Sequence, residues 1–213
     1  MIDLRSHTTA SIPANVFVAS LIAASLFAGI APSAAAAQAR TFSATTGSRI
    51  QFVSDAPLER ITGTSASVTG DITVNPADLS SVSGSIRVPI RTIRTGDDLR
   101  DEHLRSDSWL DAGAHPDAIF EITSVEGATS LSPGEVTRVT LHGRFSIHGR
   151  THDITASAQI RYIPAADGNP DLIRAQARFT VSLPDFGVSV NPLVRLKVSD
   201  TIAVNVTIRC AAR

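Results

Sequence analysis

Apolar and polar residues alternate with a period of two over most of this chain, from about residue 40 to its end. In the last run, Ile202, Val204, Val206 and Ile208 occupy every second position. A period of two places these side chains on one face of a β-strand. The same reading gives about eight strands, over 50–53, a glycine-punctuated pair within 61–74, 86–91, 118–125, 139–148, 154–162, 173–183 and 202–208. Turn sequences such as Asp167-Gly168-Asn169-Pro170 separate them.

Eight long strands favour a closed antiparallel barrel, because an open sheet would leave two edges and an uncovered apolar face. A barrel of this size either fills its interior with side chains or holds one elongated ligand. Alternation alone does not say whether the apolar face points inward, so an outer-membrane β-barrel is an alternative. Only 5% of the residues are aromatic, with one Trp and one Tyr. Such a chain lacks aromatic girdles, which favours an apolar face turned toward a lumen.

The alternation stops between residues 95 and 116. Thr95 or Asp97 can cap a helix with an acidic first turn, and Pro116 ends the segment. We therefore predict an all-β fold, an eight-stranded antiparallel barrel with a short helix between strands at one end.

The first 39 residues read as an export signal. Residues 8–39 carry no charge, and the apolar run 16–30 follows a short start that contains Arg5. Small residues precede expected cleavage after Ala37 or Ala39, although an uncleaved anchor is an alternative. The predicted domains are thus a signal peptide over 1–39 and a barrel over 40–213, in a protein that is periplasmic or secreted.

Charge and cysteine content narrow the partners further. The formal net charge is −1, without the basic excess of a nucleic-acid-binding protein, so we expect no nucleic acid partner. Cys210 is the one cysteine and cannot form an internal disulfide. It continues the apolar parity of the last strand, which indicates a buried structural thiol.

Four ordered motifs resemble the bacterial YceI-like family. The first is a block over 95–120 that contains Thr95-Gly96, the segment 100–106 (RDEHLRS), Trp109-Leu110-Asp111, His115-Pro116 and Phe120. The other three are the hairpin 141–151, Asp185-Phe186-Gly187 and Val198-Ser199-Asp200. The resemblance covers essentially all of 40–213. It implies an exported, lipocalin-like barrel whose apolar lumen holds a polyisoprenoid or another long amphiphile. This chain departs from the family pattern at Leu183, where the family has arginine, and at Trp109-Leu110, where the family has paired aromatics.

Burial of apolar surface is the only chemistry that such a barrel needs, so we expect no catalysis and no cofactor. Small residues on the inner faces, such as Gly143, Ala156 and Ala177, favour open space inside. The long connection 184–197 suggests a lid over the mouth, with Phe186 closing the cavity. The predicted ligand-binding residues are Phe52, Ile72, Ile86, Val88, Ile90, Phe120, Leu141, Phe145, Ile160, Phe179, Phe186 and Val204.

Three alternatives rest on particular residues. Arg100, Asp101 and His103 could serve an enzyme, because a carboxylate that orients a histidine forms a general base. The plainer interpretation is a solvated helix with i,i+3 and i,i+4 ion pairs. His142 and His148 share one strand face but lie about 20 Å apart, so they cannot share one metal ion. His148 and His152 could meet across the hairpin, but Asp153 is the only carboxylate beside them, so we expect no metal. An exposed strand edge near the helix would allow two barrels to form a homodimer.

Overall fold

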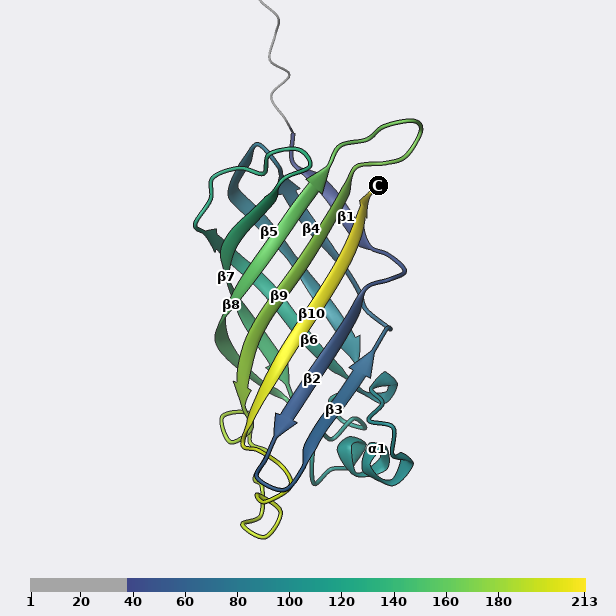
Figure 1. Cartoon of the computed structure of the whole chain (residues 1–213), viewed down its shortest axis with the longest axis vertical. Helices are drawn as coiled ribbons and strands as arrows, with labels where there is room; N and C mark the ends of the chain where they lie inside the picture. Colours follow the sequence, from purple (N-terminus) through teal and green to yellow (C-terminus); the bar gives the residue numbers. More distant parts are fainter. Residues whose placement is uncertain (1–37) are drawn as a thin grey trace, which may run out of the picture. The chain divides into compact units, whose positions relative to one another are not determined.

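The computed structural model describes residues 38–213, which form a ring of antiparallel strands with a short helix at one end (Figure 1). The predicted signal peptide covers residues 1–39. All of it except residues 38 and 39 lies outside the described residues. The elements in chain order are β1 (Arg40–Ala44), β2 (Arg49–Asp55), β3 (Arg60–Ser65), β4 (Thr69–Asn75), β5 (Asp78–Pro89), the 3-10 turn η1 (Ile90–Thr92), α1 (Asp98–Arg105), β6 (Asp117–Glu126), β7 (Val136–Ile147), β8 (Arg150–Ile163), β9 (Leu172–Ser182) and β10 (Thr201–Ala212).

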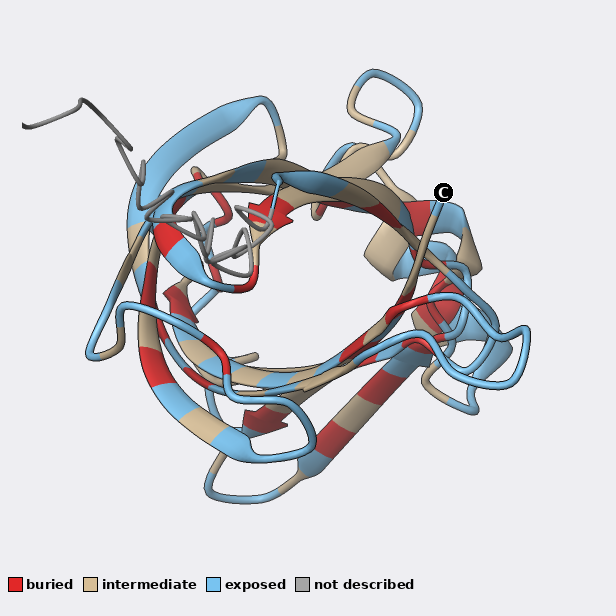
Figure 2. Cartoon of the chain, turned by 90° about the horizontal axis from the view of Figure 1, so that it is seen from above, coloured by how far each residue is buried: buried red, intermediate tan, exposed pale blue. Residues whose placement is uncertain are grey.

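Eight of these strands close the ring, in the order β1-β4-β5-β6-β7-β8-β9-β10, because β1 pairs with both β4 and β10. The hairpin β2–β3 continues the wall below β1. β1 lies along residues 210–212 of β10, and β2 lies along residues 202–207 of the same strand. Seen from above, the strands form a closed ring, and buried and exposed residues alternate along them (Figure 2). The predicted closed antiparallel barrel is confirmed.

The segment 90–116 packs along the free edge of β3, the last strand of the sheet. Thr64 of β3 and Arg94 exchange two backbone hydrogen bonds of 2.8 and 2.9 Å, and the amide of Ile90 donates to the carbonyl of Pro116. The predicted helix forms here as α1, and the carboxylate of Asp97 caps it by accepting from the amide of Arg100 at 2.9 Å. Within residues 38–213, no helix is long and apolar enough to cross a bilayer.

The strand boundaries differ from the sequence prediction in two places. β1 was not predicted, because Phe42 is the single large apolar residue in its five positions. β5 starts at Asp78, well before the predicted strand at 86, because its first half is rich in serine and shows no apolar alternation. At the other end of this strand, Ile90 has already entered the turn η1.

The β7–β8 hairpin depends on a glycine at its turn. His148 and Gly149 have φ angles of 51° and 70°, the pair of positive values that a two-residue type I′ turn requires. This turn places the hairpin end at the same end of the barrel as α1 (Figure 1). We call this end the mouth end.

The opposite end, the far end, carries both the β4–β5 turn and the long β6–β7 loop (Figure 1). The amide of Leu131 in that loop donates to Pro76 at 2.7 Å, and the amide of Leu79 donates to Thr129 at 2.9 Å. Phe42 and Cys210, where β1 joins β10, are part of the same buried cluster as Leu79 and Leu131. The far end is therefore packed with side chains.

Candidate functional site

The barrel encloses an apolar cavity of about 400 Å³. Nearly all of its lining side chains are aliphatic or aromatic, and they project from the inner faces of the strands and from the mouth end. Among the described residues, none from the far-end loops 127–135 and 164–171 contributes to the lining. The lining therefore stops short of these loops, and the cavity's volume falls in the range of small-molecule sites.

Ten of the twelve predicted ligand-binding residues line this cavity. They are Phe52, Ile72, Ile86, Val88, Phe120, Leu141, Phe145, Phe179, Phe186 and Val204. The other two lie elsewhere. Ile90 is fully buried against Ile93, Leu110 and Val188, which themselves line the cavity, because it belongs to the turn η1 and not to the strand. Ile160 packs at the far end against the buried cluster there.

Four phenylalanines form a continuous aromatic group on one side of the cavity. Phe120 and Phe179 are stacked with ring centroids 5.8 Å apart, and Phe145 meets Phe179 edge-on at 5.4 Å. Phe145 also meets Phe186 edge-on at 5.6 Å. Such offset and edge-to-face pairs are the favoured aromatic geometries. Strands β6, β7 and β9 and the β9–β10 loop thus share one wall.

Two glycines make room for aromatic rings. Gly143 of β7 lies in the wall that holds the phenylalanines, and Gly63 of β3 lies opposite Phe52 of β2. A Cβ atom on Gly143 would lie 2.5 Å from the ring of Phe120, and one on Gly63 would lie 2.1 Å from the ring of Phe52. The expectation that Gly143 leaves open space is therefore wrong, because the Phe120 ring occupies that space. Alanines such as Ala156 and Ala177 do border the cavity.

The β9–β10 loop covers part of the mouth. Phe186 is 1% exposed, and its carbonyl oxygen lies 2.8 Å from Nδ1 of His148 in the β7–β8 turn. Further along the loop, Val194, Lys197 and Val198 border the cavity. The loop contribution at 194–198 was missed from the sequence, since loops have no periodicity to read.

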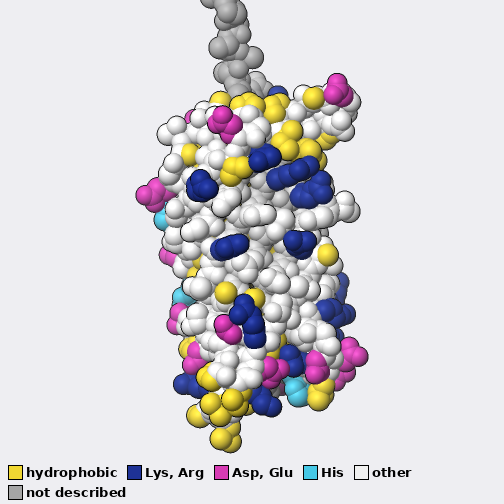
Figure 3. All heavy atoms as spheres, viewed as in Figure 1, with side chains coloured by type: hydrophobic (Ala, Val, Ile, Leu, Met, Phe, Trp, Pro, Cys, Tyr) yellow, Lys and Arg dark blue, Asp and Glu magenta, His cyan; other side chains and the backbone are white. Residues whose placement is uncertain are grey.

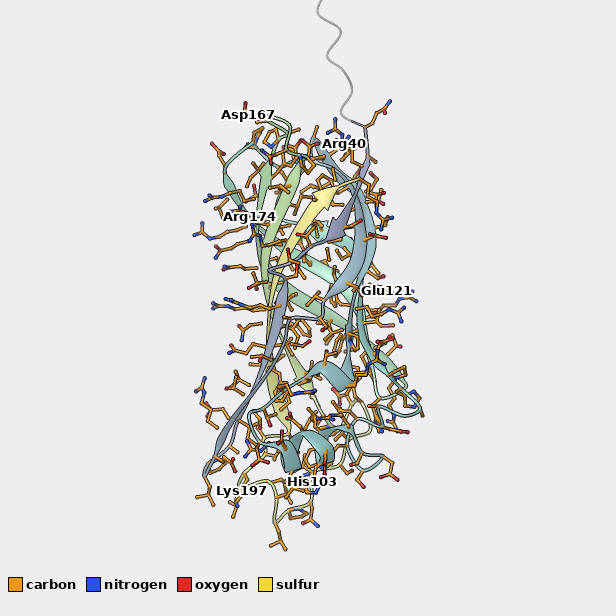
Figure 4. All side chains as sticks on the ribbon, turned by 90° about the vertical axis from the view of Figure 1, so that its right-hand side faces the viewer. Arg40, His103, Glu121, Asp167, Arg174 and Lys197 are labelled. Carbon is orange, nitrogen blue, oxygen red and sulfur yellow. The ribbon has the colours of Figure 1, made fainter. Side chains whose placement is uncertain are left out.

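Polar side chains meet the cavity mainly at the mouth end. Arg100 of α1 donates to Glu59 of the β2–β3 turn at 2.8 Å, and both side chains are one third exposed. His103 and Lys197 also border the cavity and are exposed to solvent, and Figure 4 shows both at this end of the barrel. The site therefore combines a long apolar interior with a charged rim.

Asp101 performs a different task from its neighbours on α1. It is 1% exposed, and its carboxylate accepts from both the amide and the hydroxyl of Thr95, at 2.8 and 2.7 Å. Burial raises the pKa of Asp101, but these two hydrogen bonds and the nearby charges of Arg105 and Arg94 outweigh it and hold the pKa below its usual value. Among the described residues, no hydrogen bond joins Asp101 to His103. The carboxylate therefore fastens α1 to the preceding segment and does not orient the histidine.

The model of the YceI-like domain matches residues 43–210. The chain belongs to the YceI-like family. A UPF0312 protein of Pseudomonas paraeruginosa is 27% identical over 126 residues, which are 57% of this chain and 60% of that protein. The chain thus spans less than two thirds of the length of this curated relative.

Solved structures share the fold at lower identity. A polyisoprenoid binding domain from Saccharophagus degradans, implicated in plant cell wall breakdown, matches with a TM-score of 0.61 and 15% identity, over 83% of this chain and all of that domain. A Campylobacter jejuni YceI protein matches with a TM-score of 0.60 and 22% identity, over 72% and 85% of the two chains. Burkholderia cenocepacia BcnA gives 0.60 and 15%, over 76% and 95%. These likenesses establish the YceI-like fold.

The two departures from the YceI-like pattern both fall on the cavity. Leu183, Trp109 and Leu110 line it near the mouth. Leu183 keeps this part of the wall apolar. Within the described residues, no three His, Cys, Asp or Glu side chains gather closely enough to hold a metal ion.

Proposed function

We propose that the protein is an exported carrier or sequestering protein that holds a polyisoprenoid or another long-chain amphiphile in its lumen, without catalysing a reaction. The observation that carries the proposal is the cavity itself. It is apolar along most of its length and carries charged side chains at its mouth end. Each methylene that it removes from water contributes about 0.8 kcal/mol before ordering costs.

The arrangement of polar groups supports an amphiphile over a plain hydrocarbon. A chain inserted into the lumen would leave its head beside Glu59, Arg100 and Lys197 at the mouth. The polyisoprenoid-binding neighbour has the same fold, which supports an isoprenoid as the first ligand to test. The isolation of Asp101 from His103 supports a binding role over general-base catalysis.

Export rests on the sequence of residues 1–39, with its charge-free apolar run and small residues before the cleavage point. We propose that the mature protein begins near Arg40, in the periplasm or outside the cell. N-terminal sequencing of the protein purified from a periplasmic fraction would give Gln38 or Arg40 as the first residue. Recovery of an uncleaved chain in the membrane pellet would contradict this part of the proposal.

The binding role is tested by filling the lumen. Ala177 of β9 borders the cavity, whereas Thr180 of the same strand is exposed on the outside. Ala177→Trp should weaken binding of fluorescently labelled geranylgeraniol at least tenfold, and Thr180→Trp should leave it unchanged, in a fluorescence titration. Equal affinity in both variants would remove the lumen as the binding site. Labelled palmitate, titrated in parallel, separates an isoprenoid preference from general amphiphile binding.

A further inference from the structure

The outer wall of the barrel carries a concentration of arginines that the proposed function does not use. Strand register sorts outward-facing residues of β7, β8, β9, β10 and β2 into three neighbouring rows. The rows are Val136, Arg161, Arg174 and Arg209; then Arg138, Gln159, Gln176, Thr207 and Arg49; then Thr140, Ser157, Arg178, Asn205 and Gln51. We call these fourteen residues the arginine face. Six of them are arginines, and no aspartate or glutamate is among them.

The first row places three arginines in directly opposite positions on neighbouring strands. Arg161 lies directly opposite Arg174, and Arg174 lies directly opposite Arg209. Neighbouring strands are only about 4.8 Å apart, and like charges in directly opposite positions destabilise a sheet. The fold therefore tolerates a repulsion here that a single glutamate in the row would relieve.

The arginines of the arginine face differ from the other arginines of the molecule in their ion pairs with carboxylates. Within residues 38–213, none of the six arginines of the arginine face forms an ion pair with a carboxylate. Outside this face, nine of eleven arginines do, the exceptions being Arg91 and Arg150. Figure 3 shows Lys and Arg side chains spread over the middle of the barrel wall, with Asp and Glu side chains mainly toward its edges and ends. The near-neutral total charge thus conceals a strong segregation of charge.

The form of the arginine face indicates the kind of anion that it fits. It extends over five strands and three rows, about 19 Å by about 14 Å. A shallow depression of about 420 Å³ borders it, lined in part by Arg138 and Arg178. No aromatic residue is present to stack a nucleobase, as single-stranded nucleic acids require. A two-dimensional array of cations matches a two-dimensional array of anions better than it matches one polymer strand.

We propose that the arginine face docks the barrel side-on to a bilayer that contains anionic phospholipid. Guanidinium groups bind phosphate oxygens in paired hydrogen bonds, and several basic side chains near an anionic surface act together. Figure 4 places Arg174 and Lys197 on the same side of the barrel, toward the far end and the mouth end respectively. Side-on docking therefore also brings Lys197, which borders the cavity, toward the lipid surface. This docking goes beyond the proposed cargo and does not require that the cavity be filled.

The test compares two pairs of substitutions that change net charge equally. Arg161→Gln with Arg174→Gln neutralises two residues of the arginine face. Arg87→Gln with Arg144→Gln neutralises two exposed arginines of the outer wall that pair with Asp117 and Glu121. Vesicle co-sedimentation with equal parts phosphatidylcholine and phosphatidylglycerol measures binding, and vesicles of phosphatidylcholine alone are the reference.

We expect the wild type to bind only the anionic vesicles, and to be released as salt rises. The Arg161/Arg174 double variant should lose about thirtyfold in affinity at low salt, since each basic residue near such a surface is worth about a factor of five. The Arg87/Arg144 variant should lose less than threefold. Thermal melting controls for folding, and removal of the repulsion should leave the Arg161/Arg174 variant at least as stable as the wild type.

Equal losses in the two double variants, or equal binding to both kinds of vesicle, would overturn the proposal. So would absence of vesicle binding by a protein that binds heparin or an oligonucleotide, since the partner would then be a polymer. Titration of both double variants with labelled geranylgeraniol keeps cargo binding separate. Loss of vesicle binding with unchanged cargo binding in the Arg161/Arg174 variant would show that docking depends on the arginine face and not on the lumen. Loss of cargo binding with unchanged vesicle binding would contradict a docking role for this face.

Discussion

The two ends of the barrel are built from the same strands and differ in what fills them. At the far end, Phe42 is fully buried beside Leu79 and Leu131, and loops fold onto one another by backbone hydrogen bonds. At the mouth end, Phe52 borders an open cavity, and Leu193 on the covering loop is 84% exposed. The comparison teaches that one set of strands can support both a packed end and an end that borders a cavity, and we expect the end with the cavity to be the less stable of the two.

The largest effect should come from truncating one phenylalanine at each end. Phe42→Ala removes a ring from a packed cluster and should lower the free energy of unfolding by about 3–5 kcal/mol. Phe52→Ala should lower it by only about 2 kcal/mol, because a ring that borders a cavity already lacks neighbours on one side. Equilibrium unfolding in urea measures both. Equal losses would mean that the two ends are packed alike.

A smaller effect is expected at Asp101, which holds the helix at the mouth end. Its pKa is lowered in the folded protein, so its stabilisation is complete above the unfolded pKa of about 3.9 and is lost as the pH falls through the folded pKa. Asp101→Asn should therefore cost about 1.5 kcal/mol at pH 7. The difference from the wild type should shrink below about pH 4. A pH-independent difference in urea unfolding would show that the carboxylate charge contributes nothing.

The smallest effect should follow from Leu193→Ser on the covering loop. Because this side chain is 84% exposed, the free energy of unfolding should change by less than about 0.5 kcal/mol. Amides in the described loop 183–200 should also exchange with solvent faster than those of β9 and β10, as measured by hydrogen exchange. Protection of the loop equal to that of the strands would show that the mouth is as rigid as the far end.

The sequence predicted the barrel well because parity is a local signal that the folded ring preserves. Phe120, Phe145 and Phe179 were placed on the inner wall by their spacing alone, and all three line the cavity. Ile90 fits the same parity, but Pro89 and the following turn take it out of the strand, which alternation cannot reveal. β1 escaped prediction because one phenylalanine in five residues makes no pattern.

The arginine face was hidden from the sequence for a different reason. A net charge of −1 counts arginines without saying which of them become neighbours. Arg161, Arg174 and Arg209 belong to three different strands and become neighbours only through strand register. The role of the β9–β10 loop could not be predicted from the sequence either, because the contribution of Val194 and Lys197 to the cavity depends on where the loop folds back. Sequence patterns thus located the interior wall, while the rim and the outer surface required the assembled sheet.

The ring is joined at its last seam by three residue pairs, from Phe42 with Ala212 to Ala44 with Cys210. Burial, with a smaller contribution from the charge of Asp71, raises the pKa of the Cys210 thiol to about 11. A thiol in this state is protonated at neutral pH and shielded from reagents, so it reacts only after β1 and β10 separate. The rate at which a thiol reagent labels Cys210 therefore measures how often β1 and β10 separate and the barrel opens.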